Sequence, residues 1–337
     1  VMLRYAKDKQ LIEDVRQWCN NTDYSQSKKI YSQLKIQLER FAQDDYTSFR
    51  WNRNYQEAKA LLISIFSKAN LKPLYYSNDQ DIKDALPKKD THSGWTYILT
   101  DKKRKGDNLE DIYEAFMRTV NEAKSEGSFS RPILIGVRTQ CGNVFNEDGS
   151  KIYDEHNQPI KATHKTRLVS MIDLHQIIAE LIWAKPLQKL LGDQTLWYAG
   201  GKNDRDLLNR IIHLRGKYRN WISLDYSKYD QSISSWLIKD AFEILSYAFS
   251  DIGDTKLWEI IQYDFINKVF IDGEGKIWES HKGVPSGSMF TQIIDSVVNQ
   301  LMVTTFMIAK GKGSRSFDTL IMGDDNLIFV NGVEKSE

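Results

Sequence analysis

The stretch FDTLIMGDDNLIFV, residues 317–330, decides the fold because it joins two apolar strands through a short polar turn. Gly323 and Asn326 tolerate the positive φ angles that a tight hairpin requires. Asp324 and Asp325 are then neighbours at the hairpin tip. Two adjacent carboxylates repel each other unless a cation shares them. Taken alone, Gly-Asp-Asp is more often a solvent-facing turn, so the rest of the sequence must decide its role.

A further carboxylate stands at the end of another expected strand. Asp225 follows Trp221–Leu224 and opens the sequence DYSKYD. Mg²⁺ prefers oxygen ligands, and two such ions about 4 Å apart can activate an attacking 3′-hydroxyl and stabilise leaving pyrophosphate. The ligands required are two or three carboxylates that converge from different strand ends. Asp225 and Asp324 can supply them with Asp325 beside them, although a strand-end aspartate alone is common.

A loop rich in glycine and serine, GVPSGS at 283–288, leads into an apolar stretch that predicts a long helix. Thr291, Asp295 and Asn299 fall at i, i+4 and i+8 and therefore form one polar stripe. Such a stripe is as readily the solvent side of a helix as a functional surface. An enzyme that distinguishes ribose from deoxyribose needs hydrogen-bonding groups at the 2′-hydroxyl. Asp230 and the stripe are chemically suited to that task.

Basic residues gather on a predicted strand and at the end of the preceding one. Lys165 and Arg167 flank Thr166, so both side chains point to one face of the strand. Arg138 ends the earlier β-rich run. A clustered positive face can hold a triphosphate, with arginine as the bidentate group. Lysine and arginine are also ordinary on solvated surfaces.

Composition places the chain among ordinary soluble globular proteins. It has 337 residues, of which 41% are hydrophobic and 27% charged, with a net charge of +1. This balance argues mildly against a nucleic-acid partner, so the location of the charges must decide. Two cysteines, Cys19 and Cys141, exclude a disulfide scaffold or a cysteine-rich zinc site. No stretch approaches the roughly 18 apolar residues that span a bilayer, so we expect no membrane partner. The chain begins without Met, and we expect it to be part of a longer protein.

The order of expected elements predicts an α+β domain with helices on one face of a small antiparallel sheet. Residues 1–70 are expected to be mostly helical and residues 71–110 irregular. The expected helices are Tyr55–Ser67, Asp107–Ala123, Asp173–Leu191, Ser235–Phe249, Thr255–Asn267 and Phe290–Ala309. The expected strands are Pro132–Arg138, Thr166–Met171, Trp221–Leu224, Val269–Ile271, Lys276–Trp278, Phe317–Met322 and Asn326–Val330.

Together these segments resemble the right-hand polymerases of RNA viruses, in particular those of partitivirus-type double-stranded RNA viruses, with picobirnaviruses as neighbours. The resemblance covers roughly residues 87–330. Its segments are Asp225–Asp230 for motif A, 283–299 for motif B, Gly323-Asp324-Asp325 for motif C, Arg138-Thr139-Gln140 with Lys165-Thr166-Arg167 for motif F, and Thr91-His92-Ser93-Gly94 for motif G.

The resemblance implies an RNA-dependent RNA polymerase that joins ribonucleotides by a two-metal mechanism, with Mg²⁺ or Mn²⁺ as cofactor. Its partners would be RNA template and product, nucleoside triphosphates and viral capsid protein, in the virion interior or host cytoplasm. Implied roles are metal binding for Asp225, Asp324 and Asp325, nucleotide binding for Arg138, Lys165, Arg167, Asp230, Ser286, Gly287, Thr291, Asp295 and Asn299, and template binding for Ser93 and Gly94. Many positive-strand polymerases carry Asn where this chain has Asp295.

The implied architecture is an N-terminal helical extension or fingertips (1–70), fingers (71–215) and an antiparallel-sheet palm (216–337). The palm would carry a fingers insertion at about 250–282, and the thumb is missing. A reverse transcriptase shares the palm, but it typically has an aromatic residue and one other before its aspartate pair, where this chain has Met322-Gly323. A catalytically silent palm-fold protein that binds RNA or capsid would not need three converging carboxylates.

Overall fold

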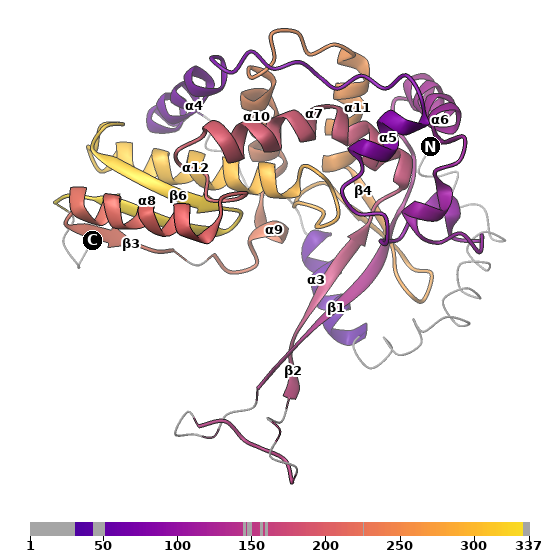
Figure 1. The fold of residues 1–337 in the computed structure, drawn as a ribbon, viewed down its shortest axis with the longest axis horizontal. Helices are drawn as coiled ribbons and strands as arrows, with labels where there is room; N and C mark the ends of the chain where they lie inside the picture. Colours follow the sequence, from indigo (N-terminus) through magenta and orange to yellow (C-terminus); the bar gives the residue numbers. More distant parts are fainter. Residues whose placement is uncertain are drawn as a thin grey trace.

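The computed structural model describes residues 31–42, 51–143, 146, 150–155, 158, 161–224 and 226–332. Helices and strands alternate through these ranges, which confirms a mixed α+β fold (Figure 1). The hairpin at 317–330 is present as β6 (Phe317–Met322) and β7 (Asp325–Val330). Gly323 has a φ of 67°, a left-handed conformation that favours glycine. Gly323 therefore serves the turn as predicted, whereas Asn326 lies inside β7 and is not among the described residues with positive φ.

Strand β3 (Asn220–Ile222) pairs with β7, so the described residues form an antiparallel sheet in the order β3-β7-β6. Each face of this sheet carries apolar side chains and each is covered by a helix. Leu320 and Phe329 pack under α8 (Asp204–Lys217). Ile321 and Ile328 belong to the main core on the other side, where α12 (Thr291–Ala309) contacts β6. The expectation of helices on one face only is therefore wrong.

Helix α8 was not predicted because its sequence, DRDLLNRIIHLRGK, is rich in charge, with six charged residues among fourteen. Leu207, Ile211 and Leu214 recur at the spacing of one helical face and reach the sheet. A narrow apolar stripe of this kind suffices because the partner surface is a flat sheet face.

Another sheet has the order β2-β1-β4-β5. Its long antiparallel pair, β1 (Ile133–Asn143) and β2 (Lys161–Met171), projects away from the helices (Figure 1). Strands β4 (Lys268–Ile271) and β5 (Ile277–Ser280) form the expected hairpin. Strand β4 joins β1 in parallel, so this sheet is mixed and not purely antiparallel.

The other predicted helices are present with shifted ends, and residues 79–85 form a short helix where irregular structure was expected. The remaining helices are α3 (Tyr31–Phe41), α4 (Arg53–Phe66), α5 (Asp79–Ala85), α6 (Ile112–Glu126), α7 (Leu174–Gln194), α9 (Tyr229–Ser232), α10 (Ser235–Ser246) and α11 (Thr255–Ile266).

Helix α12 is the centre of the core and packs against α4, α10, α7 and β6. By length and apolar composition it could cross a membrane, which corrects the expectation that no stretch approaches that length. Most of the helix is buried inside the fold, as in the core helix of a globular protein.

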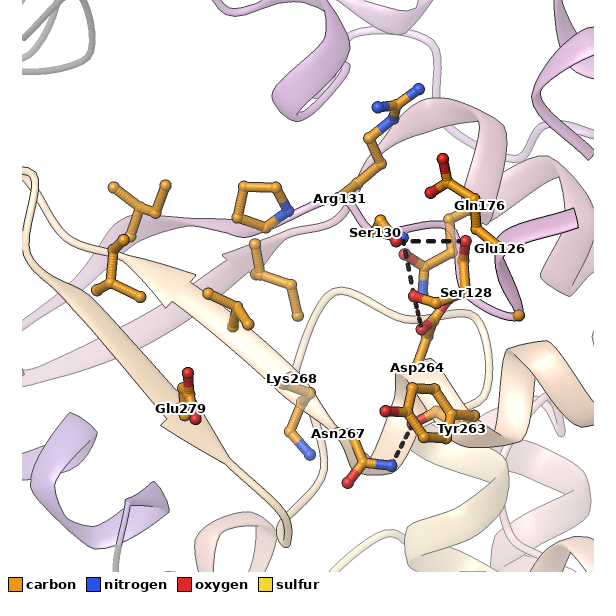
Figure 2. A pocket seen from close by; sticks show the side chains of 16 residues that line it. Glu126, Ser128, Ser130, Arg131, Gln176, Tyr263, Asp264, Asn267, Lys268 and Glu279 are labelled. Carbon is orange, nitrogen blue, oxygen red and sulfur yellow. Dashed lines mark hydrogen bonds between the residues drawn. The ribbon is translucent and has the colours of Figure 1, made fainter. Parts of the chain in front are cut away.

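A cavity of about 370 Å³ lies where the ends of α6 and α11 meet β1, β4 and β5 (Figure 2). Val269, Ile271 and Ile277 give it an apolar wall, and Glu126 and Glu279 are among its charged residues. None of the site residues predicted from the sequence lines this cavity. It is therefore separate from the carboxylate site described below.

A buried ion pair joins α4 to α10. The Lys59 ammonium donates to Asp240 at 3.1 Å and to Glu243 at 2.7 Å, and the Asp240 side chain is fully buried. The Tyr55 hydroxyl donates to the second Asp240 oxygen at 2.7 Å. Removal of one partner would leave a buried charge uncompensated.

We predict that Lys59→Met lowers the free energy of unfolding by about 3 kcal/mol, the cost of leaving the buried Asp240 charge without its cation. Urea denaturation measures it. Lys35→Met is the matched control, since Lys35 pairs with Glu39 on an exposed helix face, and its effect should stay below about 0.5 kcal/mol. Equal effects of the two substitutions would contradict the prediction.

Candidate active site

The polar stripe of α12 holds the tip of the β6–β7 hairpin. The Asn299 amide nitrogen donates to the carbonyl oxygens of Gly323 at 2.9 Å and Asp324 at 3.1 Å. The Ser296 hydroxyl accepts a hydrogen bond from the Gly323 N–H at 2.8 Å. Asn299 is fully buried, so the stripe is not the solvent side of the helix. The side chains of Asp324 and Asp325 remain exposed at the tip.

The segment on either side of Asp225 is bonded to the hairpin or to the helix α12 that holds it. The Leu224 N–H donates to Asn326 Oδ1 at 3.1 Å. The Tyr226 hydroxyl donates to Asn299 Oδ1 at 3.4 Å. Asp225 itself lies outside the described residues. Its convergence with Asp324 therefore stays a prediction. Of its two chain neighbours, Leu224 is bonded to Asn326 of the hairpin and Tyr226 to Asn299 of α12, which holds the hairpin tip.

Asp295 is a buried carboxyl group beside the hairpin tip. Burial raises its pKa well above the ordinary value, and the negative charges of Asp230 and Asp324 raise this pKa further. Its Oδ1 atom has no hydrogen-bond partner among the described residues. The raised pKa favours the protonated form of Asp295, in which the carboxyl group can donate a hydrogen bond, as an Asn amide would.

The donor chemistry at the tip suits a hard divalent cation. Asp324 and Asp325 present adjacent exposed carboxylates, and the charges of Asp230 and Asp324 act together on Asp295. Within the ranges that the structure describes, no group of three or more His, Cys, Asp or Glu side chains is placed to hold a metal ion. Asp225, the third ligand that the sequence predicts, is not in those ranges, so the ligand set stays a prediction.

The loop before α12 rests against β2. Ser286 Oγ accepts from the Ser170 N–H at 3.0 Å and donates to the Leu168 carbonyl at 3.3 Å. A Cβ atom on Gly287 would lie 1.8 Å from the Ser170 carbonyl oxygen, so glycine alone permits this approach. Thr291 Oγ1 donates to the Pro285 carbonyl at 2.7 Å. In this conformation the Thr291 hydroxyl closes the loop, and its proposed contact with ribose stays a prediction.

Arg138 and Arg167 are direct cross-strand partners in the β1–β2 pair, and both side chains are exposed. Like charges directly opposite each other destabilise a strand pair, so an anion between them would be favourable. The backbone of Lys165 pairs with Gln140, while its side chain lies outside the described residues. The structure thus brings together two of the three predicted triphosphate-binding cations.

Ser93 and Gly94 lie in tight packing at the start of α7. The Ser93 side chain is fully buried and its hydroxyl accepts from Asn108 Nδ2 at 3.0 Å. A Cβ atom on Gly94 would lie 2.4 Å from the Asp173 Cα atom. Contact between the Ser93 side chain and a template strand would require this segment to leave its packing. The template-binding role of these residues stays a prediction.

Several residues that shape the site were not predicted from the sequence. Asn326 fixes the hairpin to the Leu224 backbone, while Glu180 and Lys268 contact the two ends of the loop at 283–288. Asn326 follows the aspartate pair directly and could have been suspected from that position. Glu180 and Lys268 are far from every motif in the sequence, so only the fold reveals them.

Comparisons with known proteins agree with the geometry. The chain is 36% identical over 123 residues to the RNA-directed RNA polymerase of Cryptosporidium parvum virus 1, a match that covers 34% of this chain and 22% of that protein. It is 33% identical over 179 residues to the genome polyprotein of human parechovirus 5, which covers 50% of this chain and 8% of that protein. The matches thus span about a fifth or less of these relatives.

The family described as viral RNA-dependent RNA polymerase matches residues 4–336. This match takes in the hairpin, the loop, α12 and the β1–β2 pair. Because it extends over nearly the whole chain, the protein belongs to the viral RNA-dependent RNA polymerase family.

Proposed function

We propose that this chain contains the catalytic centre of an RNA-directed RNA polymerase, which adds ribonucleotides to an RNA 3′ end as a template strand directs. The observation that carries the proposal is the exposed Asp324-Asp325 tip, fixed by Asn299 and Ser296 of the buried α12. A turn that merely faced solvent would not require two buried polar side chains to set its position. Membership of the polymerase family supports the same conclusion.

Asp324 and Asp325, together with Asp225, would hold two Mg²⁺ or Mn²⁺ ions. When bound, such ions activate the attacking 3′-hydroxyl and stabilise the leaving pyrophosphate. The contribution of the protein is to fix the carboxylates before substrate arrives. The Asn299 bonds to the hairpin and the Leu224 bond to Asn326 do this from two sides.

Arg138 and Arg167 would bind the triphosphate, because an anion relieves the repulsion between the two guanidinium groups. Lys165 would join them. Asp230 and Asp295 would read the ribose. In its protonated form, which burial favours, the Asp295 carboxyl group can donate a hydrogen bond to the 2′-hydroxyl or to Asp230, as an ionised carboxylate cannot.

The sheet β3-β7-β6 with α12 would form the palm, and β1–β2 with α6 and α7 would form part of the fingers. We assign the polymerase to replication and transcription of a viral RNA genome. The form of the loop and helix at 283–299 supports a double-stranded RNA genome. A capsid-associated location follows from that assignment.

Replacement of one tip carboxylate tests the proposal. In the complete polypeptide that contains this chain, Asp324→Asn should lower RNA synthesis by about a thousandfold, because a metal ligand is lost, while RNA affinity stays within about threefold. Primer extension and filter binding measure the two quantities. Asp318→Asn on the same hairpin is the matched control, because Asp318 faces Lys217 and Tyr218. Undiminished synthesis by the Asp324 variant would overturn the proposal.

The raised pKa of Asp295 favours its protonated form, and this predicts an asymmetric response to substitution. Asp295→Asn retains a hydrogen-bond donor and should keep ribonucleotide preference over deoxyribonucleotides within about threefold, whereas Asp295→Leu removes the donor and should lower it at least about tenfold. Single-nucleotide incorporation of paired ribo- and deoxyribonucleotides on an RNA template measures the ratio. Unaltered preference in the Leu variant would show that Asp295 is structural.

A further inference from the structure

The first residue of the loop at 283–288 is held by a buried lysine. Lys268 is 1% exposed, and its ammonium group donates to the carbonyl oxygens of Gly283 at 2.7 Å, Phe265 at 2.9 Å and Ile266 at 3.1 Å. Burial lowers the pKa of Lys268 to about 7, while three carbonyl acceptors at these distances match the three N–H bonds of the ammonium form and favour it. Figure 2 shows Lys268 at the edge of the cavity with its ammonium group directed away from Arg131. One side chain thus joins the end of α11 to the start of the loop.

The position of Gly283 leaves little room for movement. Its φ is 72°, and a Cβ atom there would lie 2.5 Å from the Phe41 ring and 2.9 Å from the Asp230 carbonyl oxygen. The N–H groups of Gly283 and Val284 donate to the carbonyl oxygens of Ile233 and Asp230, each at 2.7 Å. The start of the loop is therefore fixed to the segment that carries Asp230.

A buried glutamate holds the other end of the loop. Glu180 of α7 is fully buried and accepts hydrogen bonds from the Ser288 hydroxyl and the Met289 N–H, both at 2.8 Å. Burial raises the pKa of Glu180 to about 7. The Ser288 hydroxyl in turn accepts from the Phe290 N–H, so this anchor extends to the first turn of α12.

The middle of the loop is held differently. Ser286 is exposed and makes its two hydrogen bonds with the backbone of β2, where water can replace either partner. Water cannot replace the partner of a buried hydrogen bond. A buried carbonyl or carboxylate group that loses its partner therefore destabilises the fold by its full desolvation free energy. The loop thus has two ends that resist displacement and a middle that can leave β2.

We propose that Lys268 and Glu180 are positioning residues that fix the two ends of the loop, so that movement is confined to residues 285–287. The proposal rests on the proposed function where it concerns RNA synthesis. Neither residue contacts the predicted substrate-binding side chains directly. Both would act through the loop, which joins the Asp230 segment to α12 and hence to the hairpin tip.

Hydrogen exchange tests the anchors without any substrate. Lys268→Met should raise the exchange rates of the Gly283 and Val284 amides at least about tenfold, and Glu180→Met should do the same for Met289 and Phe290. Glu180→Gln keeps an acceptor oxygen and should keep exchange within about threefold. Lys59→Met is the control for lost stability: a buried lysine is lost at the α4–α10 interface, so exchange of the loop amides should rise no more than exchange of the core amides. Unchanged loop exchange in both Met variants, or an equal change in the control, would overturn the proposal.

Kinetics then separate positioning from mere stability. In the complete polypeptide, Lys268→Met and Glu180→Met should lower kcat for single-nucleotide addition at least about tenfold and leave the KM for nucleotide within about threefold, while Glu180→Gln restores kcat. Exchange that changes as predicted with kcat unaltered would overturn the positioning role. Absence of RNA synthesis by the unsubstituted polypeptide would instead refute the proposed function, and the exchange data would still decide whether the two residues hold the loop.

Discussion

The hydrogen bonds between Asn299 and the hairpin tip are the constraint on which the site depends. The amide nitrogen donates to two carbonyl groups of the turn, and Oδ1 accepts from Tyr226 and Asn326. One buried side chain therefore joins α12, the hairpin and the segment that flanks Asp225. Burial of an amide is favourable only when its donors and acceptors are used, so the arrangement has one low-energy geometry. This geometry fixes the turn from which the exposed carboxylates of Asp324 and Asp325 project.

The charges of this nearly neutral chain are separated in space, which its net charge of +1 conceals. Exposed carboxylates stand at the hairpin tip, and the exposed Arg138–Arg167 pair stands on the β1–β2 strands. The loop at 283–288 connects the two regions, since it touches β2 through Ser286 and continues into the helix that holds the hairpin. Such a separation fits a substrate with two different ends: a polyanionic group that binds the arginines and a reacting group that binds cations at the hairpin tip.

The sequence predicted the hairpin and the long helix because each has a local signature in turn residues or periodicity. It placed Arg138 and Arg167 on two β-rich runs but did not predict that they pair across the strands. The sequence did not decide whether the polar stripe of α12 faces solvent or the interior. Polar residues at the spacing of Asp295 and Asn299 occur both on a solvated helix face and in a buried hydrogen-bond network. It missed α8, whose charged surface hides a three-residue apolar stripe, and it missed Glu180 and Lys268. The roles of those two residues arise from tertiary burial against backbone groups far away in the chain, for which no local pattern exists.

The central claim is that Asp225 joins Asp324 and Asp325 in one cation site. A crystal structure of the protein grown with Mn²⁺, with anomalous scattering recorded at the manganese edge, tests it directly. The account predicts anomalous peaks between the carboxylates of Asp225 and Asp324, about 4 Å apart if both ions bind. An Asp225 carboxylate more than about 8 Å from that of Asp324, a separation that two ligands of one metal ion do not reach, with no peak at the hairpin tip, would contradict it.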